Sequence, residues 1–158
     1  MQKRIYIETT IPSSYYTLRT DEESIVRQKL TRQWWDDYAE LFILTSSTAV
    51  IEEIEEGRKQ ITLDRLALLN DIEIFEPTVE IVQIAQVYIE RLIMPHEPKG
   101  DALHLAIATF HQVDAMLTWN CAHLANPNKF VLIARINQEL GLSTPALTTP
   151  LDYLGETK

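Results

Sequence analysis

The sequence predicts an α/β domain in which a mostly parallel sheet of four to five strands lies between two layers of helices. Short apolar runs of strand length alternate with longer segments that have helical periodicity. Parallel neighbouring strands need crossover connections, which helices usually supply. Because nearly half of the 158 residues are apolar, we expect one ordinary globular domain over residues 1–158.

The strands are expected at short apolar runs bounded by turn residues. The first is residues 4–7, and a run that contains Pro12, residues 9–14, predicts a turn after it. Continuous apolar segments of strand length follow at 41–45, 72–75 and 115–118, and the tail offers an edge strand at 146–148. Such a series favours a sheet whose strands are linked by helices.

Helices are expected between these strands. Thr20 is the predicted cap of the first, which has Asp21, Glu22 and Glu23 in its first turn and ends near residue 40. A short helix after the caps at 46–48 ends at Gly57, and further helices cover about 59–69, 78–92 and 129–140. After a loop at 94–100, Asp101 opens a helix with Leu103, Ala106, Ile107 and Phe110 on its apolar face.

Composition excludes several classes of protein. A single cysteine, Cys121, excludes an internal disulfide and a zinc site built from several thiolates. The sequence has neither the apolar core of a signal peptide nor the ~20-residue apolar segment of a membrane span, so we expect a cytoplasmic protein with no membrane contact. The net charge of −9 argues against nonspecific binding of nucleic acid, unless cations or a basic partner compensate it.

Oxygen-bearing side chains follow the predicted strands or begin the helices after them. Glu8 follows the first strand, an acid lies in the helix after the second, Asp101 opens a later helix and Asn120 follows the strand at 115–118. Parallel sheets place their functional sites at the carboxyl ends of the strands. Carboxylate and amide oxygens suit Mg²⁺ or Mn²⁺, which would activate water for phosphodiester hydrolysis.

The acid in the short helix has two candidates. Val50, Ile51 and Ile54 define the buried face, and Glu53 and Glu55 flank it on opposite sides. The helical periodicity does not choose between these two glutamates.

Four motifs in this order resemble the PIN domain, specifically the VapC-like toxins of prokaryotic toxin–antitoxin pairs, over nearly the whole chain: Tyr6-Ile7-Glu8-Thr9; Ser47 followed by Glu53-Ile54 and Gly57; Gly100-Asp101-Ala102-Leu103-His104; and Leu117-Thr118-Trp119-Asn120. The resemblance implies a PIN-like α/β/α sandwich and selects Glu53 over Glu55. It implies that Glu8, Glu53, Asp101 and Asn120 are both the catalytic and the metal-binding residues.

The resemblance also implies an activity and partners. It implies a Mg²⁺- or Mn²⁺-dependent endoribonuclease that cuts RNA with a metal-activated water, is inhibited by a cognate antitoxin and often forms a homodimer. Two positions depart from the family pattern, because Glu8 and Asn120 stand where Asp is usual. A neutral amide lowers the charge of the site, so we expect one tightly held ion.

Other residues have both a functional and a structural interpretation. His104 lies one helical turn from Asp101 and, with Thr9, is a candidate to support the metal site or contact substrate; it is equally consistent with a satisfied buried histidine. Asp101 alone could be a helix cap. Arg27, Lys29 and Arg32 lie beside Trp34, Trp35 and Tyr38, a pattern that fits RNA or antitoxin contact if the aromatic rings are not core.

Two other functions compete with the nuclease. A PIN-fold module without nuclease activity, acting through a protein partner, would fit the neutral Asn120 and the acidic net charge. A phosphatase with an aspartyl nucleophile after the first strand has little support, because Glu8-Thr9-Thr10 contains no Asp.

Overall fold

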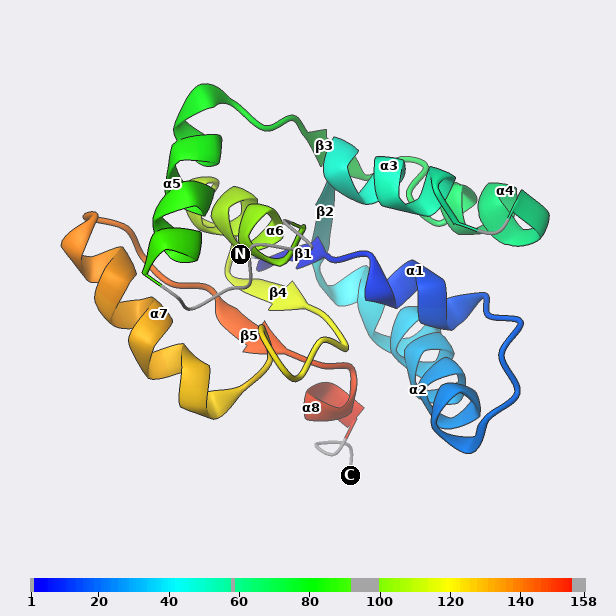
Figure 1. The fold of residues 1–158 in the computed structure, drawn as a ribbon. Helices are drawn as coiled ribbons and strands as arrows, with labels where there is room; N and C mark the ends of the chain where they lie inside the picture. The colour runs from blue at the N-terminus through cyan, green and yellow to red at the C-terminus, as the bar shows by residue number, and fades with distance from the viewer. Residues whose placement is uncertain (1, 58, 92–99, 155–158) are drawn as a thin grey trace.

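The fold is built on a five-stranded sheet in which every pair of neighbouring strands is parallel (Figure 1). The structure, a computed structural model, describes residues 2–57, 59–91 and 100–154, so most of the predicted loop at 94–100 lies outside the described residues. The sheet order is β3-β2-β1-β4-β5, and the strands are β1 (Arg4–Ile7), β2 (Ile43–Ser47), β3 (Glu73–Phe75), β4 (Ala115–Leu117) and β5 (Ala146–Thr148). The predicted parallel α/β architecture is confirmed.

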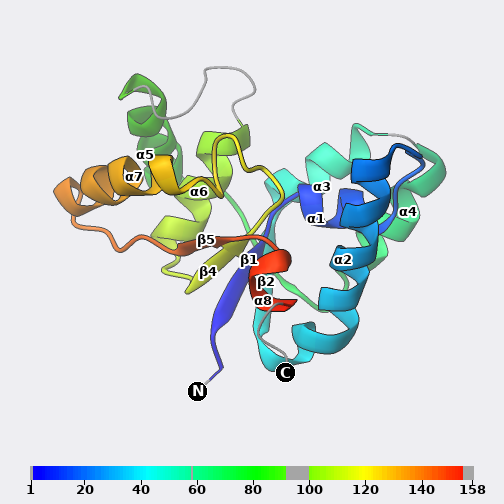
Figure 2. The ribbon, with the colours of Figure 1, turned by 90° about the horizontal axis from the view of Figure 1, so that it is seen from below.

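Helices lie on both faces of this sheet (Figures 1 and 2). One face carries α5 (Val79–Glu90), α6 (Gly100–Phe110) and α7 (Pro127–Glu139), and the other carries α1 (Thr10–Tyr15), α2 (Glu22–Tyr38) and α4 (Lys59–Ala67). The remaining helices are short: η1 (Ala39–Leu41), α3 (Thr48–Glu55) and α8 (Leu151–Leu154). In the described part of the chain, no helix combines the length and apolar character needed to cross a membrane.

The central strand and α6 form the middle of the core. Ile5, Tyr6 and Ile7 of β1 are at most 1% exposed. Of the apolar face predicted for α6, Ala106 and Ile107 are fully buried as expected, whereas Phe110 is 36% exposed. Burial also extends beyond the predicted face, to Ala102 and Leu105. α6 packs against both the sheet and α5, so burial extends around most of the helix.

The turn predicted at 9–14 is wrong, because α1 occupies this segment. Pro12 is tolerated since it lies in the first turn, where a backbone N–H has no intrahelical acceptor. Glu8 satisfies the first amides, with its side chain accepting from Thr10 N at 3.1 Å and its carbonyl accepting from Ile11 N at 3.0 Å. The fully buried side chain of Ile11 fixes α1 against the core.

The second strand begins and ends two residues later than predicted. Leu41 is exposed in η1, whereas Ser46 and Ser47 are fully buried in β2. Polar side chains stay in this strand because they make tertiary hydrogen bonds. Ser46 Oγ donates to Ile7 O at 2.9 Å, and the Thr45 hydroxyl donates to Ile5 O at 3.1 Å. Hydrophobicity alone therefore misplaces the strand by two residues.

The helix caps agree with the sequence at several positions. Ser47 and Thr78 cap α3 and α5 with side-chain oxygens that accept backbone N–H groups. Asp21, not the predicted Thr20, caps α2 by accepting from Ser24 N at 3.1 Å. A charged cap at this position also interacts favourably with the positive end of the helix.

Candidate metal centre

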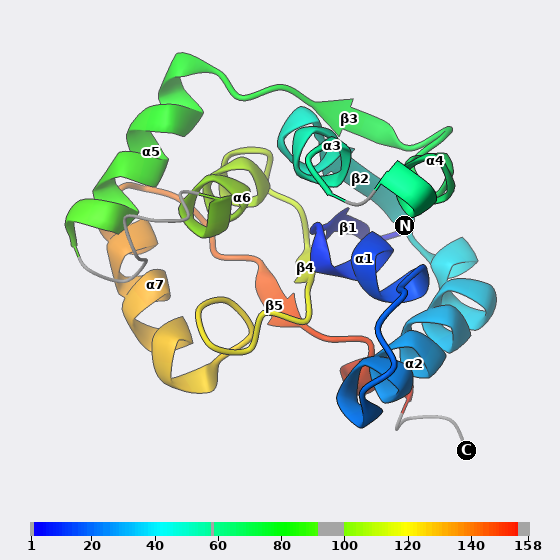
Figure 3. The ribbon, with the colours of Figure 1, turned by 45° about the vertical axis from the view of Figure 1, so that its right-hand side comes forward.

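Carboxylates from distant parts of the chain meet at the carboxyl ends of β1 and β4, where α1, α3 and α6 come together (Figure 3). Glu8 follows β1, Glu53 belongs to α3, and Asp101 and His104 belong to α6. Glu8, Glu53 and His104 each offer one metal-ligating atom, and these atoms lie within 4.8 Å of one another. Asp101 lies outside this group, although its charge acts on His104. We call Glu8, Glu53 and Asp101 the carboxylate cluster.

Glu8 is held by the loop after β4 and by the start of α1. Its Oε1 accepts hydrogen bonds from the Thr10 backbone N–H, the Thr10 hydroxyl and, at 2.7 Å, the Thr118 hydroxyl. The side chain is only 4% exposed. A buried carboxylate with three donors on one oxygen is kept in a single orientation.

Glu53 is held by His104 and Thr9. Its Oε1 accepts from His104 Nε2 at 3.0 Å and from the Thr9 hydroxyl. Burial raises the pKa of Glu53, but the hydrogen bond and charge of His104, with the bond from Thr9, outweigh it, so the pKa is lowered. Glu55, the other candidate from the sequence, is exposed.

Asp101 and Asn120 form a directly bonded pair at the same edge. Asp101 is 8% exposed, and its Oδ1 accepts from Asn120 Nδ2 at 3.0 Å. The Asn120 amide oxygen is occupied by the backbone N–H of His123 at 3.0 Å. The structure therefore brings Asn120 to the cluster as a partner of Asp101, with its own oxygen already engaged.

Each member of the carboxylate cluster has one oxygen bound by the protein and one to which no described residue donates. The bonds above end on Oε1 of Glu8, Oε1 of Glu53 and Oδ1 of Asp101. Within the described ranges, the second oxygen of each carboxylate accepts no hydrogen bond. The protein thus orients three negative groups and leaves an oxygen of each available to a ligand.

His104 connects Glu53 to a buried chain of hydroxyl groups. Its Nδ1 lies 2.7 Å from the Tyr6 hydroxyl, which lies 2.7 Å from Ser47 Oγ. Burial lowers the pKa of His104, but the hydrogen bond to Glu53 and the charges of Glu8, Glu53 and Asp101 raise it, and the result is a raised pKa. His104 therefore positions Glu53 and balances part of the negative charge.

The Glu53–His104 pair predicts a specific pH dependence of stability in metal-free protein. Because the pKa of Glu53 is lowered, its contribution to the free energy of unfolding is complete above pH 4.5, which is the ordinary pKa. This contribution is lost as pH falls through the lowered pKa. The raised pKa of His104 makes its contribution complete below 6.5, and the contribution is lost as pH rises through the raised pKa. Stabilisation by the pair is thus greatest between pH 4.5 and 6.5.

Urea unfolding in EDTA measures this effect. Relative to His104→Gln, which can donate to Glu53 without a charge, the wild type is expected to lose free energy of unfolding as pH rises above 6.5. Parallel pH profiles for the two proteins would contradict the assignment.

The three basic residues predicted for RNA or antitoxin contact differ in their surroundings. Arg27 is partly buried, pairs with the exposed Glu23 at 3.2 Å and lies over the Trp119 ring. Arg32 donates to the Tyr15 carbonyl at 2.9 Å, and Lys29 is exposed. Of the neighbouring aromatic residues, Trp34 is fully buried and stacks on Phe42, so it is core and is not available to a base.

Several supporting residues were not predicted from the sequence. Tyr6, Ser47, Thr10 and Thr118 hold the cluster, and all four lie within three residues of the ends of β1, β2 and β4. Gly100 allows Glu53 to approach α6, because a Cβ on Gly100 would lie 2.5 Å from Glu53 Oε2. In the sequence, the glycine directly before Asp101 is the signal that indicates this close approach.

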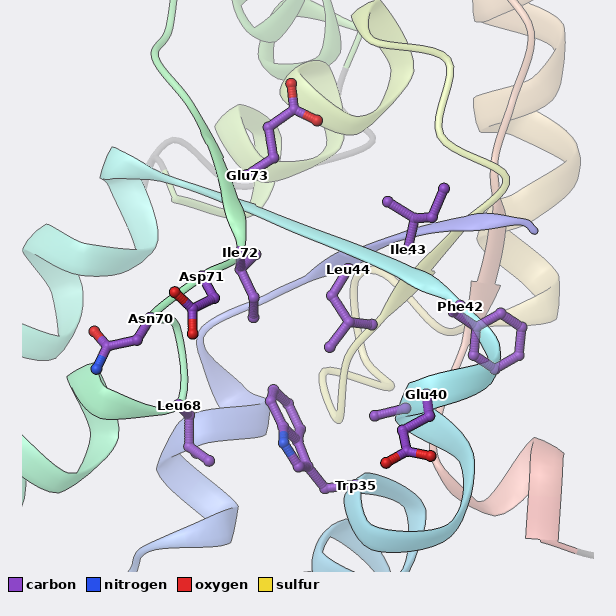
Figure 4. A pocket seen from close by; sticks show the side chains of 11 residues that line it. Trp35, Glu40, Phe42, Ile43, Leu44, Leu68, Asn70, Asp71, Ile72 and Glu73 are labelled. Carbon is purple, nitrogen blue, oxygen red and sulfur yellow. The ribbon is translucent and has the colours of Figure 1, made fainter. Parts of the chain in front are cut away.

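A cavity of about 530 Å³ lies at the opposite edge of the sheet, where β2 and β3 begin (Figure 4). Its lining includes the apolar side chains of Trp35, Phe42, Ile43, Leu44 and Ile72. None of the predicted site residues lines this cavity. The lining also includes Glu40, Asn70, Asp71 and Glu73, and the carboxylate cluster is separate from this cavity.

Comparisons with solved structures identify the fold. VapC20 of Mycobacterium tuberculosis, a toxin that cleaves the sarcin-ricin loop, matches with a TM-score of 0.56 at 13% identity over 71% of this chain and 86% of its own. VapBC2 of Rickettsia felis, solved with a promoter DNA fragment, matches with a TM-score of 0.58 at 14% identity, covering 92% and 98%. FitAcB of Neisseria gonorrhoeae gives 0.57 at 13% identity, covering 93% and 98%.

The sequence itself matches no family model and no curated protein. At these identities the likeness establishes shared architecture, and the parallel sheet with helices on both faces agrees with it. This chain therefore shares the fold of these VapC and toxin–antitoxin structures.

Proposed function

We propose that this protein is a Mg²⁺- or Mn²⁺-dependent endoribonuclease. The observation that carries the proposal is the carboxylate cluster: Glu8 and Glu53 lie together with His104, and Asp101 is in the first turn of the helix that carries His104. Each of the three acids has one oxygen to which no described residue donates. Buried like charges repel one another, and a cation bound here would relieve the repulsion that His104 balances only in part. VapC20, which shares the fold, is a toxin that cleaves the sarcin-ricin loop.

The donor set fits a hard divalent cation. Glu8, Glu53 and Asp101 would hold the ion through carboxylate oxygens, the ligand type that Mg²⁺ and Mn²⁺ prefer, with remaining positions for water and phosphate. Asn120 would act through Asp101, because its amide oxygen is bonded to His123 N. Once bound, such an ion supplies an acidified water and neutralises charge on a phosphodiester.

The protein's own side chains supply orientation. Thr10 and Thr118 hold Glu8, His104 and Thr9 hold Glu53, and Asn120 holds Asp101. Such supporting bonds fix the geometry of a metal site before the ligand arrives, and losing one typically costs about 10- to 100-fold in metal affinity or activity. We assign Thr9 and His104 to this positioning role.

Calorimetric titration with Mn²⁺, combined with cleavage of a mixed RNA pool, tests the proposal. The wild type is expected to bind Mn²⁺ and to cleave RNA only when Mn²⁺ or Mg²⁺ is present. Glu53→Gln should lose cleavage and should bind Mn²⁺ roughly tenfold or more weakly than the wild type. Glu55→Gln is the matched control, since it removes the same charge from an exposed position on the same helix and should behave as the wild type.

Two results would reject the enzyme. Absence of Mn²⁺ binding by the wild type would favour a nuclease-inactive module that acts through a protein partner. Equal loss in Glu53→Gln and Glu55→Gln would indicate a general charge effect without a specific site.

A cognate antitoxin and a homodimer belong to the same proposal. The related structures from Klebsiella pneumoniae and Rickettsia felis are a toxin–antitoxin complex and a VapBC pair. On this chain, Ile25 and Val26 of α2 are each more than half exposed, which suits an apolar contact with such a partner. Light scattering of the purified chain, alone and with the protein encoded beside it, tests both associations.

A further inference from the structure

A second polar site lies between α1, α2 and α4, next to the loop that follows β4. It is a pocket of about 200 Å³ that contains three arginines, Arg19, Arg27 and Arg65. Hydroxyl side chains form much of the remaining wall, from Ser13, Ser14, Thr17 and Ser24. None of the described residues that line it is acidic. In a chain with a net charge of −9, this concentration of positive charge is unexpected. We call it the arginine pocket.

Arg65 carries a charge that no described carboxylate neutralises. Its Nε donates to the Tyr16 carbonyl at 2.8 Å, and one terminal nitrogen donates to the Ser13 carbonyl at 3.1 Å. Among the described residues no acid lies within salt-bridge distance of it. Burial lowers the pKa of Arg65, which reflects a partly desolvated cation. An anion in the pocket would offset that desolvation.

The other two arginines have replaceable partners. Arg19 pairs with Asp21 at 3.2 Å and Arg27 pairs with Glu23 at 3.2 Å, and both acids are at the solvent-exposed start of α2. Exposed pairs of this kind contribute little to stability, so an arginine can exchange its carboxylate for a phosphate at small cost. Stacking on the Trp119 ring keeps the Arg27 guanidinium at the pocket while its partner changes.

The pocket shares residues with the support of the carboxylate cluster. Thr10 lines the pocket, and its hydroxyl donates to Glu8 and accepts from the Trp119 backbone N–H at 2.7 Å. Trp119, which also lines the pocket, precedes Asn120, the partner of Asp101. α1, which carries Ser13 and Ser14, lies between α2 and α4 and begins beside Glu8 (Figure 3). The arginine pocket and the carboxylate cluster therefore adjoin each other through Thr10 and Trp119.

We propose that the arginine pocket binds a backbone phosphate of single-stranded RNA next to the phosphodiester at the carboxylate cluster, through Arg27 and Arg65 and the hydroxyl groups of α1. The inference rests on the proposed nuclease function. Arginine and hydroxyl groups are the usual donors to nucleic-acid phosphates, and they fix the register of the strand without reading its sequence. A local cationic site also accounts for RNA binding by an acidic protein.

Fluorescence anisotropy with a labelled single-stranded oligoribonucleotide of mixed sequence tests the pocket, in EDTA so that binding is measured without cleavage. Arg27→Gln and Arg65→Gln are each expected to weaken binding about tenfold and to reduce the salt dependence of affinity by about one phosphate contact. Arg135→Gln, the same charge change at an exposed site on α7, should alter affinity less than about twofold.

Arg27→Gln separates a loss of phosphate binding from a loss of folding. Arg65 donates to the Ser13 and Tyr16 carbonyls, whereas the Arg27 side chain pairs with Glu23. The proposal would be overturned if Arg27→Gln, Arg65→Gln and Arg135→Gln all bound RNA as tightly as the wild type, or if all three lost the same amount of affinity. The proposal would also be overturned if Arg27→Gln and Arg65→Gln weakened the binding of inorganic phosphate but left the affinity for RNA unchanged. Metal-dependent cleavage by the wild type, measured in parallel, separates failure of the pocket from failure of the nuclease.

Discussion

Asp101→Asn is expected to abolish metal-dependent RNA cleavage and leave the fold intact. The asparagine keeps the shape and an oxygen that can accept from Asn120 Nδ2, so the pairing at 3.0 Å is retained. It removes a buried negative charge from the cluster, and removing one group that stabilises charge at a site typically costs about 100-fold or more in kcat. Initial rates of cleavage of a fluorescent RNA at saturating Mn²⁺ measure the loss.

Asp114→Asn supplies the control. Asp114 is exposed just before β4, at the opposite edge of the sheet, and accepts from the Arg4 backbone N–H at 2.8 Å. It removes the same charge and keeps an acceptor, so full activity is expected. Full activity of Asp101→Asn, with thermal unfolding unchanged, would eliminate Asp101 from the catalytic site.

Gly100→Ala is expected to weaken the metal site and at the same time preserve or raise stability. Gly100 is helical and its φ is not positive, so alanine should favour α6 by up to about 1 kcal/mol. The new Cβ, however, would lie 2.5 Å from Glu53 Oε2, and the carboxylate would have to move by roughly 1 Å to reach ordinary contact. Because His104 and Thr9 hold the other oxygen, this movement disturbs the cluster, and we expect about a 10- to 100-fold loss of Mn²⁺ affinity.

A double-mutant cycle shows whether the effect acts through Glu53. In the Glu53→Gln background, Gly100→Ala should cause no further loss of Mn²⁺ affinity, because the group that it displaces has already lost its charge. Calorimetry measures the affinities and urea unfolding measures the stabilities. Additive losses, or a loss of stability with unchanged affinity, would mean that Gly100 serves packing instead of the site.

The sequence by itself determined the sheet and the segments that carry the acids. Alternation of apolar strands and amphipathic helices depends on local patterns, so β1, β5 and the ends of most helices were predicted within about two residues. The same patterns placed Glu8 and Asp101 at the ends of elements that meet at one edge of a parallel sheet. They left Glu53 and Glu55 equivalent, because both flank the same apolar stripe.

Only the tertiary structure decided the details that depend on distant contacts. Glu53 is distinguished by its bonds to His104 and Thr9, residues 51 and 44 positions away along the chain. The two buried serines of β2 stay in the strand because one bonds to Ile7 O and the other to the Tyr6 hydroxyl. The helix α1 exists where a turn was predicted because Glu8 satisfies its first amides and Ile11 is buried in the core. Local patterns record which residues avoid water, whereas the partner of each buried polar group is set by how the chain folds back on itself.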